Sequence, residues 1–109
     1  MTSLTVAATQ MACGTDRERN IAKAEKLVRE AASRGARLIL LQELFETPYF
    51  CKDMKPEYME LALPVDANPA IRAMSALAKE LKVVLPVSFF ERENNALYNS
   101  LVMIDADGS

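Results

Sequence analysis

Apolar and polar positions along the first half of the chain follow two different periods. Residues 4–10 alternate apolar with more polar or smaller positions, which is typical of a strand. Apolar residues at helical spacing over 21–32 predict a helix, and Thr15 and Glu18 stand at capping-box spacing before it. The apolar run within 37–41 predicts a strand covered on both faces, so the three elements together predict a βαβ unit.

The second half repeats the alternation of helix and strand. Asn68 followed by Pro69 is typical of a helix N-terminus, and the apolar stripe behind them continues that helix. Strands are predicted over 83–90 and 97–104, with a turn between them. Because proline has no N–H to donate, Pro86 should lie at the start of its strand, at an edge or at a bulge.

The last residues have the pattern of a hairpin turn. Asp107 and Gly108 follow the strand predicted over 97–104, and no returning strand comes after them. We therefore expect residues 1–109 to be the N-terminal segment of a single larger domain. The alternative is a flexible tail after a complete domain.

Composition narrows the chemistry more than it narrows the fold. The chain has 109 residues, a formal net charge of −2 and no histidine. The absence of histidine excludes Ser-His-Asp and Cys-His catalysis within these residues, together with imidazole metal sites. No basic run and no long apolar run occur, so neither a nucleic-acid partner nor a membrane span is expected. A secretory signal pattern is also missing, which favours a cytoplasmic protein with Cys13 and Cys51 reduced.

Glu43 is the main candidate for chemistry. It directly follows the strand predicted over 37–41, and functional groups of open α/β sheets gather at the carboxyl ends of the strands. Leu44, Phe45 and Tyr49 are expected to roof the carboxylate and remove part of its water, which would suit a general base. The alternative is a solvated glutamate at a strand end.

Three segments carry a family resemblance. Residues 40–51 (LLQELFETPYFC) resemble the first active-site segment of the nitrilase superfamily of carbon–nitrogen hydrolases. Residues 6–11 (VAATQM) are similar to the first strand of that family, and 98–105 (YNSLVMID) with Gly108 resemble the strand before its catalytic-lysine segment. Around Glu43, the pattern most resembles the branch that hydrolyses N-carbamoylputrescine.

The resemblance implies an α/β fold in which this chain is the N-terminal part of a four-layer α-β-β-α sandwich. It also implies a Glu-Lys-Cys mechanism with Glu43 as general base, and with the lysine and the nucleophilic cysteine beyond Ser109. No metal or organic cofactor is implied. The implied partner is a small-molecule substrate with a carbamoyl or amide group, and the full-length protein is expected to be a homo-oligomer.

Other candidate residues have open roles. Tyr49 is the candidate for substrate binding, with an aromatic that closes the core as the alternative. Cys51 is expected to be a packing thiol rather than the nucleophile, and Asn99 to tie strand backbone together. A group of acidic residues is a candidate for attracting a cationic substrate or, alternatively, a solvated face; it consists of Glu46, Asp53, Glu57 and Glu60.

Three functions therefore remain open from the sequence. The first is hydrolysis of N-carbamoylputrescine to putrescine, carbon dioxide and ammonia. The second is hydrolysis of another N-carbamoyl or amide substrate, and the third is a non-catalytic α/β module. As a fragment of a hydrolase, the 109-residue chain alone should lack turnover, because the nucleophile and the oxyanion partner are absent. As part of a truncated sandwich, it should be marginally stable or aggregate, because half of a packed sheet pair exposes apolar faces.

Overall fold

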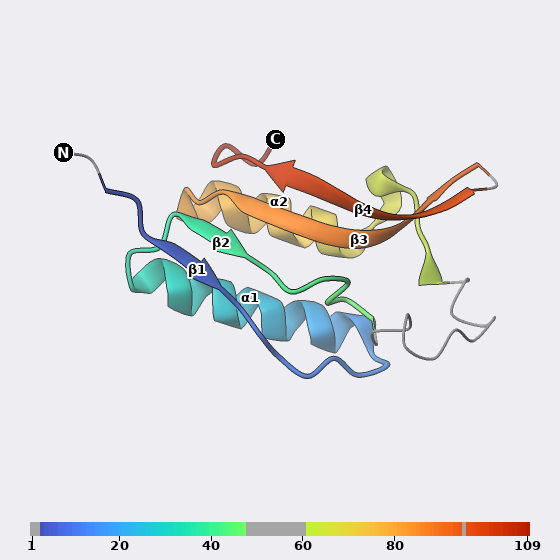
Figure 1. Cartoon of the computed structure of the whole chain (residues 1–109), viewed down its shortest axis with the longest axis horizontal. Helices are drawn as coiled ribbons and strands as arrows, with labels where there is room; N and C mark the ends of the chain where they lie inside the picture. Colours follow the sequence, from blue (N-terminus) through green and yellow to red (C-terminus); the bar gives the residue numbers. More distant parts are fainter. Residues whose placement is uncertain (1–2, 48–60, 95) are drawn as a thin grey trace.

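The computed structural model describes residues 3–47, 61–94 and 96–109. Within these ranges the predicted order of helices and strands is confirmed (Figure 1). The elements are β1 (Val6–Ala8), α1 (Arg17–Ser33), β2 (Leu38–Leu40), the 3-10 helix η3 (Val65–Ala67), α2 (Pro69–Leu81), β3 (Leu85–Glu93) and β4 (Ala96–Ile104).

The strands lie side by side in the order β1, β2, β3, β4. β1 and β2 are parallel, and β3 and β4 form an antiparallel pair. A parallel bridge joins β2 to the start of β3, where the Ile39 amide donates to the Val84 carbonyl at 3.0 Å and the Val84 amide to the Arg37 carbonyl at 2.8 Å. The first three strands therefore run in one direction, and β4 runs in the opposite direction. From these pairings, β2 and the start of β3 lie between β1 and β4.

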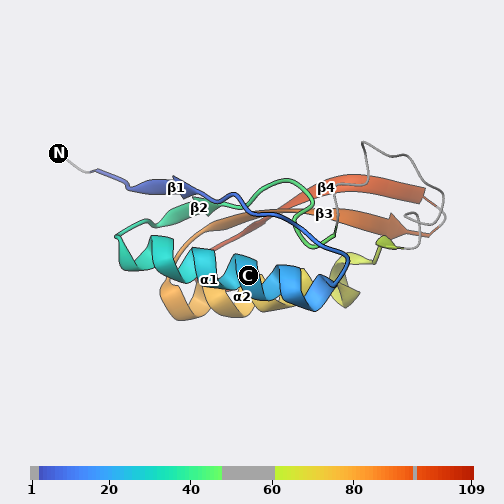
Figure 2. The same cartoon turned by 90° about the horizontal axis from the view of Figure 1, so that it is seen from below.

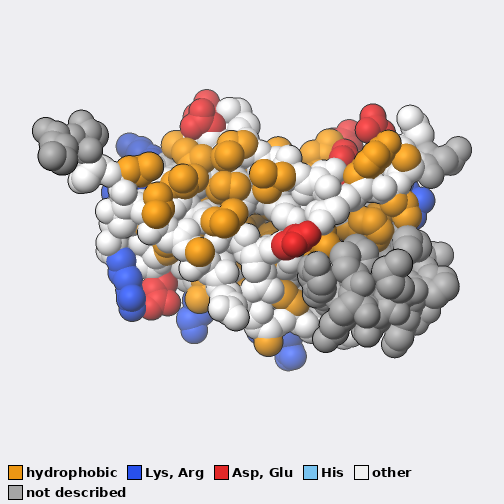
Figure 3. Space-filling view, in the orientation of Figure 1, with side chains coloured by type: hydrophobic (Ala, Val, Ile, Leu, Met, Phe, Trp, Pro, Cys, Tyr) orange, Lys and Arg blue, Asp and Glu red, His pale blue; other side chains and the backbone are white. Residues whose placement is uncertain are grey.

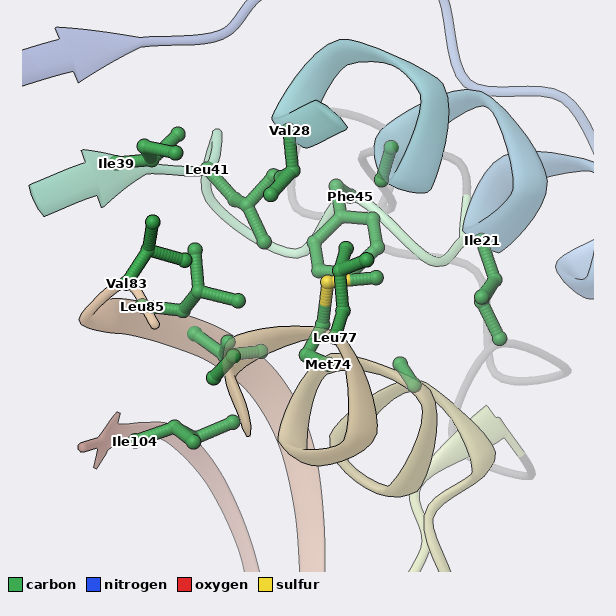
Figure 4. Close-up of a cluster of buried hydrophobic side chains, with 14 of the residues drawn as sticks. Ile21, Val28, Ile39, Leu41, Phe45, Met74, Leu77, Val83, Leu85 and Ile104 are labelled. Atoms are coloured by element: carbon green, nitrogen blue, oxygen red, sulfur yellow. The ribbon is translucent and has the colours of Figure 1, made fainter. Parts of the chain in front are cut away.

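Both helices cover the same face of the strands, as Figure 2 shows. Side chains from that face and from the two helices form the main core, and they point toward one another in Figure 4. Its fully buried members include Val28, Ile39, Met74, Leu85 and Ile104.

The opposite face of the strands is open. Val6, Leu40, Leu101 and Met103 are between 50% and 61% exposed, and hydrophobic side chains gather over the strands in Figure 3. We call the surface formed by these four residues the open face. The prediction that the strand at 37–41 is covered on both faces is wrong for the described residues, because α1 and α2 both pack on the side of Ile39.

The helix ends agree with the predicted caps except at one position. Asn68 caps α2, and its Oδ1 accepts from the amides of Ala70 and Ile71 at 2.8 and 3.1 Å. In α1 the cap is Asp16 rather than Thr15, and its Oδ1 accepts from the Arg19 amide at 3.3 Å. In the described part of the chain, neither helix is both long and apolar enough to cross a bilayer.

Candidate active site

Glu43 lies in the turn that follows β2, at the carboxyl end of that strand. Its side chain is exposed, and Oε1 accepts a hydrogen bond from Asn99 Nδ2 on β4. Asn99, Leu101 and Met103 are every second residue of β4, and such residues point to the same side of a strand. Asn99 therefore lies on the side of the sheet that carries the open face. The carboxylate is therefore held at the edge of an uncovered apolar surface.

The predicted roof over Glu43 is wrong for Leu44 and Phe45. Both side chains are buried, but Phe45 enters the main core (Figure 4) and Leu44 packs with Phe90 in a second cluster. Leu44 has a φ of 53°, in the left-handed region, and this turn sends consecutive side chains in different directions. Tyr49, the third residue of the predicted roof, lies outside the described residues.

Asn99 and Ser88 belong to the site, although the sequence predicted only a structural role for Asn99 and did not single out Ser88. Ser88 Oγ accepts from the Leu44 amide at 3.2 Å and donates to Asn99 Oδ1 at 3.3 Å. The expectation that Asn99 ties backbone together is therefore wrong, because its side chain joins two other side chains. The available signal was the position of Ser88 within the apolar first part of β3, residues 85–90.

An open pocket of about 480 Å³ adjoins Glu43. Its other lining residues come from the segment after β1 and from Gln42. Gln42 holds these parts together, because its Oε1 accepts from the Met11 amide at 2.6 Å and its Nε2 lies 3.0 Å from Cys13 Sγ. A pocket of this size accommodates a small molecule beside the carboxylate.

Cys13 is close to this pocket but is not suited to attack a substrate. Burial raises the pKa of its thiol, and the charge of Lys23 opposes this only partly. The neutral thiol is therefore favoured, whereas the thiolate is the nucleophilic form. Cys51 lies outside the described residues, and no group of three or more potential metal-ligating Cys, Asp or Glu side chains occurs in the described ranges.

Glu46 is a buried residue at the end of the turn that carries Glu43. It is only 1% exposed, its Oε1 accepts from Asn68 Nδ2 at 2.9 Å, and its Oε2 lies 3.6 Å from Arg17 Nε. Its carbonyl oxygen also accepts from Asn20 Nδ2 at 3.0 Å. A role for Glu46 in attracting a cationic substrate is therefore wrong. The other three residues of that acidic group lie outside the described residues.

The burial of Glu46 predicts a specific pH dependence of stability. Burial raises the pKa of this carboxyl, against the lowering effects of the Asn68 hydrogen bond and the Arg17 charge. Because the folded protein then binds the proton more tightly than the unfolded chain, this contribution to stability grows as the pH falls from about 7 toward about 4.5. Glu46→Gln removes it.

Denaturant midpoints of the full-length protein and its Glu46→Gln variant, measured across this pH range, test the prediction. We expect the wild type to gain stability relative to the variant on acidification. A relative loss on acidification would mean that the ion pair with Arg17 outweighs the burial of the carboxylate.

Known proteins are similar to this chain in sequence and in architecture. The family model described as carbon–nitrogen hydrolase matches residues 5–109. Over 106 residues the chain is 56% identical to the N-carbamoylputrescine amidase of Solanum lycopersicum, covering 97% of this chain and 35% of that protein. It is 43% identical over 109 residues to the citrullinase of Francisella tularensis, covering 100% of this chain and 38% of that protein.

A solved structure agrees with these matches. The carbon–nitrogen hydrolase from Helicobacter pylori G27 superposes with a TM-score of 0.84 at 30% identity, covering 97% of this chain and 37% of that one. The chain thus spans little more than a third of the length of the proteins that it matches.

Proposed function

The chain belongs to the carbon–nitrogen hydrolase family, and from this premise we propose that it supplies the general base, Glu43, of an enzyme that hydrolyses N-carbamoylputrescine. The observation that carries the proposal is the position of the Glu43 carboxylate, which follows β2, borders a pocket and accepts a hydrogen bond from Asn99. The similarity to the tomato N-carbamoylputrescine amidase supports the choice of substrate.

The proposed chemistry has two stages. A cysteine thiol from the remainder of the full-length protein attacks the carbamoyl carbon while Glu43 takes the thiol proton, and a lysine stabilises the developing oxyanion. Glu43 then gives the proton to the departing ammonia, which leaves an S-carbamoyl intermediate. Glu43 next activates a water that hydrolyses this intermediate, and the released carbamate yields carbon dioxide and putrescine.

The open face supports the remaining part of the fold proposal. We place residues 1–109 as the N-terminal part of one domain with a four-layer α-β-β-α architecture, in which a second sheet covers Val6, Leu40, Leu101 and Met103. Two packed sheets bury such faces against each other. On the strength of the family resemblance, we propose that the full-length protein is a cytoplasmic homo-oligomer.

A second substrate class shares the same acyl-transfer chemistry. The similarity to a citrullinase favours a carbamoyl compound whose other end carries a carboxylate. Citrulline carries both an ammonium group and a carboxylate at that end, whereas N-carbamoylputrescine carries an ammonium group alone. The tail of the substrate therefore separates the two proposals.

Steady-state kinetics of the full-length protein on N-carbamoylputrescine and citrulline decide between these substrates. We expect kcat/KM to favour the cationic substrate, and Tyr49→Phe mainly to raise KM if the hydroxyl of Tyr49 binds it. A preference for citrulline would support the second class. If the protein releases ammonia from neither compound and from no simple amide, the result would support a non-catalytic α/β module instead.

A further inference from the structure

We propose that Asn99 and Ser88 are positioning residues that hold the Glu43 carboxylate in the orientation needed for proton transfer. This inference rests on the proposed role of Glu43. It goes beyond that role because it assigns a task to two residues of the β3–β4 hairpin, whose Asn99 is 56 positions away from Glu43 in sequence.

The chemistry of the hydrogen bonds fixes the direction of each one. The Leu44 amide can only donate, so Ser88 Oγ accepts from it and turns its own hydrogen toward Asn99 Oδ1. The Nδ2 group of Asn99 then faces Glu43, where an ionised carboxylate can only accept. Each member of the chain thus determines the orientation of the next.

The three hydrogen bonds and the peptide bond between Glu43 and Leu44 form a closed ring of contacts. Leu44 directly follows Glu43, so the hydrogen bond from the Leu44 amide to Ser88 holds the backbone of the turn. The hydrogen bond from Asn99 holds the side chain of Glu43 in the same turn. Leu44 is also buried against Phe90 of β3. Glu43 is therefore fastened at its backbone and at its carboxylate to the same pair of strands.

The support itself is a regular pair of strands. β3 and β4 pair without interruption from Leu85 opposite Ile104 to Glu93 opposite Ala96. Because Asn99 engages Oε1, Oε2 is the oxygen that we assign to proton exchange with the thiol, the ammonia and the water. Small misplacements of a catalytic group can cost on the order of 100-fold in rate.

Two substitutions in the full-length enzyme test the proposal. Asn99→Asp keeps the size of the side chain and replaces the donor by an acceptor, so we expect kcat to fall by about 10- to 100-fold with KM within about twofold. Ser88→Ala should lower kcat by a smaller factor, and Ser88→Thr, which keeps the hydroxyl, should restore it. Adding Ser88→Ala to Asn99→Asp should cause a smaller loss than Ser88→Ala causes alone, because the part of its effect that passes through Asn99 is already lost and only its contact with the Leu44 amide remains to be removed.

Ser100→Ala is the matched control. Its hydroxyl bonds Glu91 Oε1 at 2.7 Å and not Glu43, so its loss should leave kcat unchanged. If Asn99→Asp prevents folding, the kcat values of Ser88→Ala and Ser88→Thr test the positioning role instead. Wild-type kcat in the folded Asn99 and Ser88 variants, or an increase in KM alone, would overturn the inference.

Glu43→Gln distinguishes failure of this inference from failure of the proposed function. An inactive Glu43→Gln variant beside fully active Asn99 and Ser88 variants would leave Glu43 as the base and remove only the positioning role. A fully active Glu43→Gln variant would remove the proposed role of Glu43 itself.

Discussion

Glu43→Gln is expected to lower kcat of the full-length enzyme on N-carbamoylputrescine by about 10²- to 10⁴-fold, the usual contribution of a general base. The amide has the size of the carboxylate and can still accept the hydrogen bond from Asn99, but it cannot take the thiol proton. Because the amide keeps the size of the carboxylate and the hydrogen bond from Asn99, we expect the variant to fold, with a midpoint of thermal unfolding close to that of the wild type. Steady-state kinetics and a thermal melt measure both quantities.

Glu93→Gln provides the matched control. Glu93 is an exposed carboxylate at the end of β3, so its neutralisation changes the net charge equally without touching the pocket. We expect its kcat to remain that of the wild type. A Glu43→Gln enzyme with kcat within about threefold of the wild type would exclude Glu43 from the general-base role, because that role contributes at least about 10²-fold.

Placing charges on the open face should have opposite consequences in the two chain lengths: it should improve the solution behaviour of the 109-residue chain and should disrupt the full-length protein. Leu40→Glu together with Leu101→Glu should reduce self-association of the 109-residue chain, because both leucines are at least half exposed there. In the full-length protein the same pair should prevent folding. If the second sheet covers these positions, each leucine loses contacts worth roughly 2–5 kcal/mol, and each carboxylate must be buried as well.

Val65→Glu is the control for this experiment. Val65 is 42% exposed but lies in η3, not on the strands, so its substitution should be tolerated in both chain lengths. Sedimentation of the 109-residue chain and the soluble yield of the full-length protein are the measurements. A full-length protein that folds with both glutamates in place would contradict the proposed second sheet.

Sequence patterns predicted the elements because the patterns are local. The stripe of α2 and the cap at Asn68 depend on neighbours within a few positions, and both are confirmed. The cap of α1 was placed one residue early because Thr15 and Asp16 are both competent caps, and only the observed hydrogen bond separates them. The exposure of Leu40 was not predicted because a continuous apolar run does not reveal which of its faces the available residues cover.

The candidate site was predictable only in part. The position of Glu43 after β2 follows from chain order, but its partners follow from the register of β3 against β4 and from the left-handed turn at Leu44. Neither the register nor the turn has a local signal at Glu43. Sequence reasoning therefore found the carboxylate but not the hydrogen bond that it accepts from Asn99.

A structure of the full-length protein would test whether Glu43 is the general base of a thiol hydrolase, through the distances from the Glu43 carboxylate to the nearest cysteine Sγ and lysine Nζ. We predict that both groups come from the chain beyond Ser109 and face Glu43 across the pocket, at hydrogen-bond distance or through one water. A Glu43 carboxylate with no cysteine thiol facing it would contradict the claim that this chain carries the general base of a thiol hydrolase.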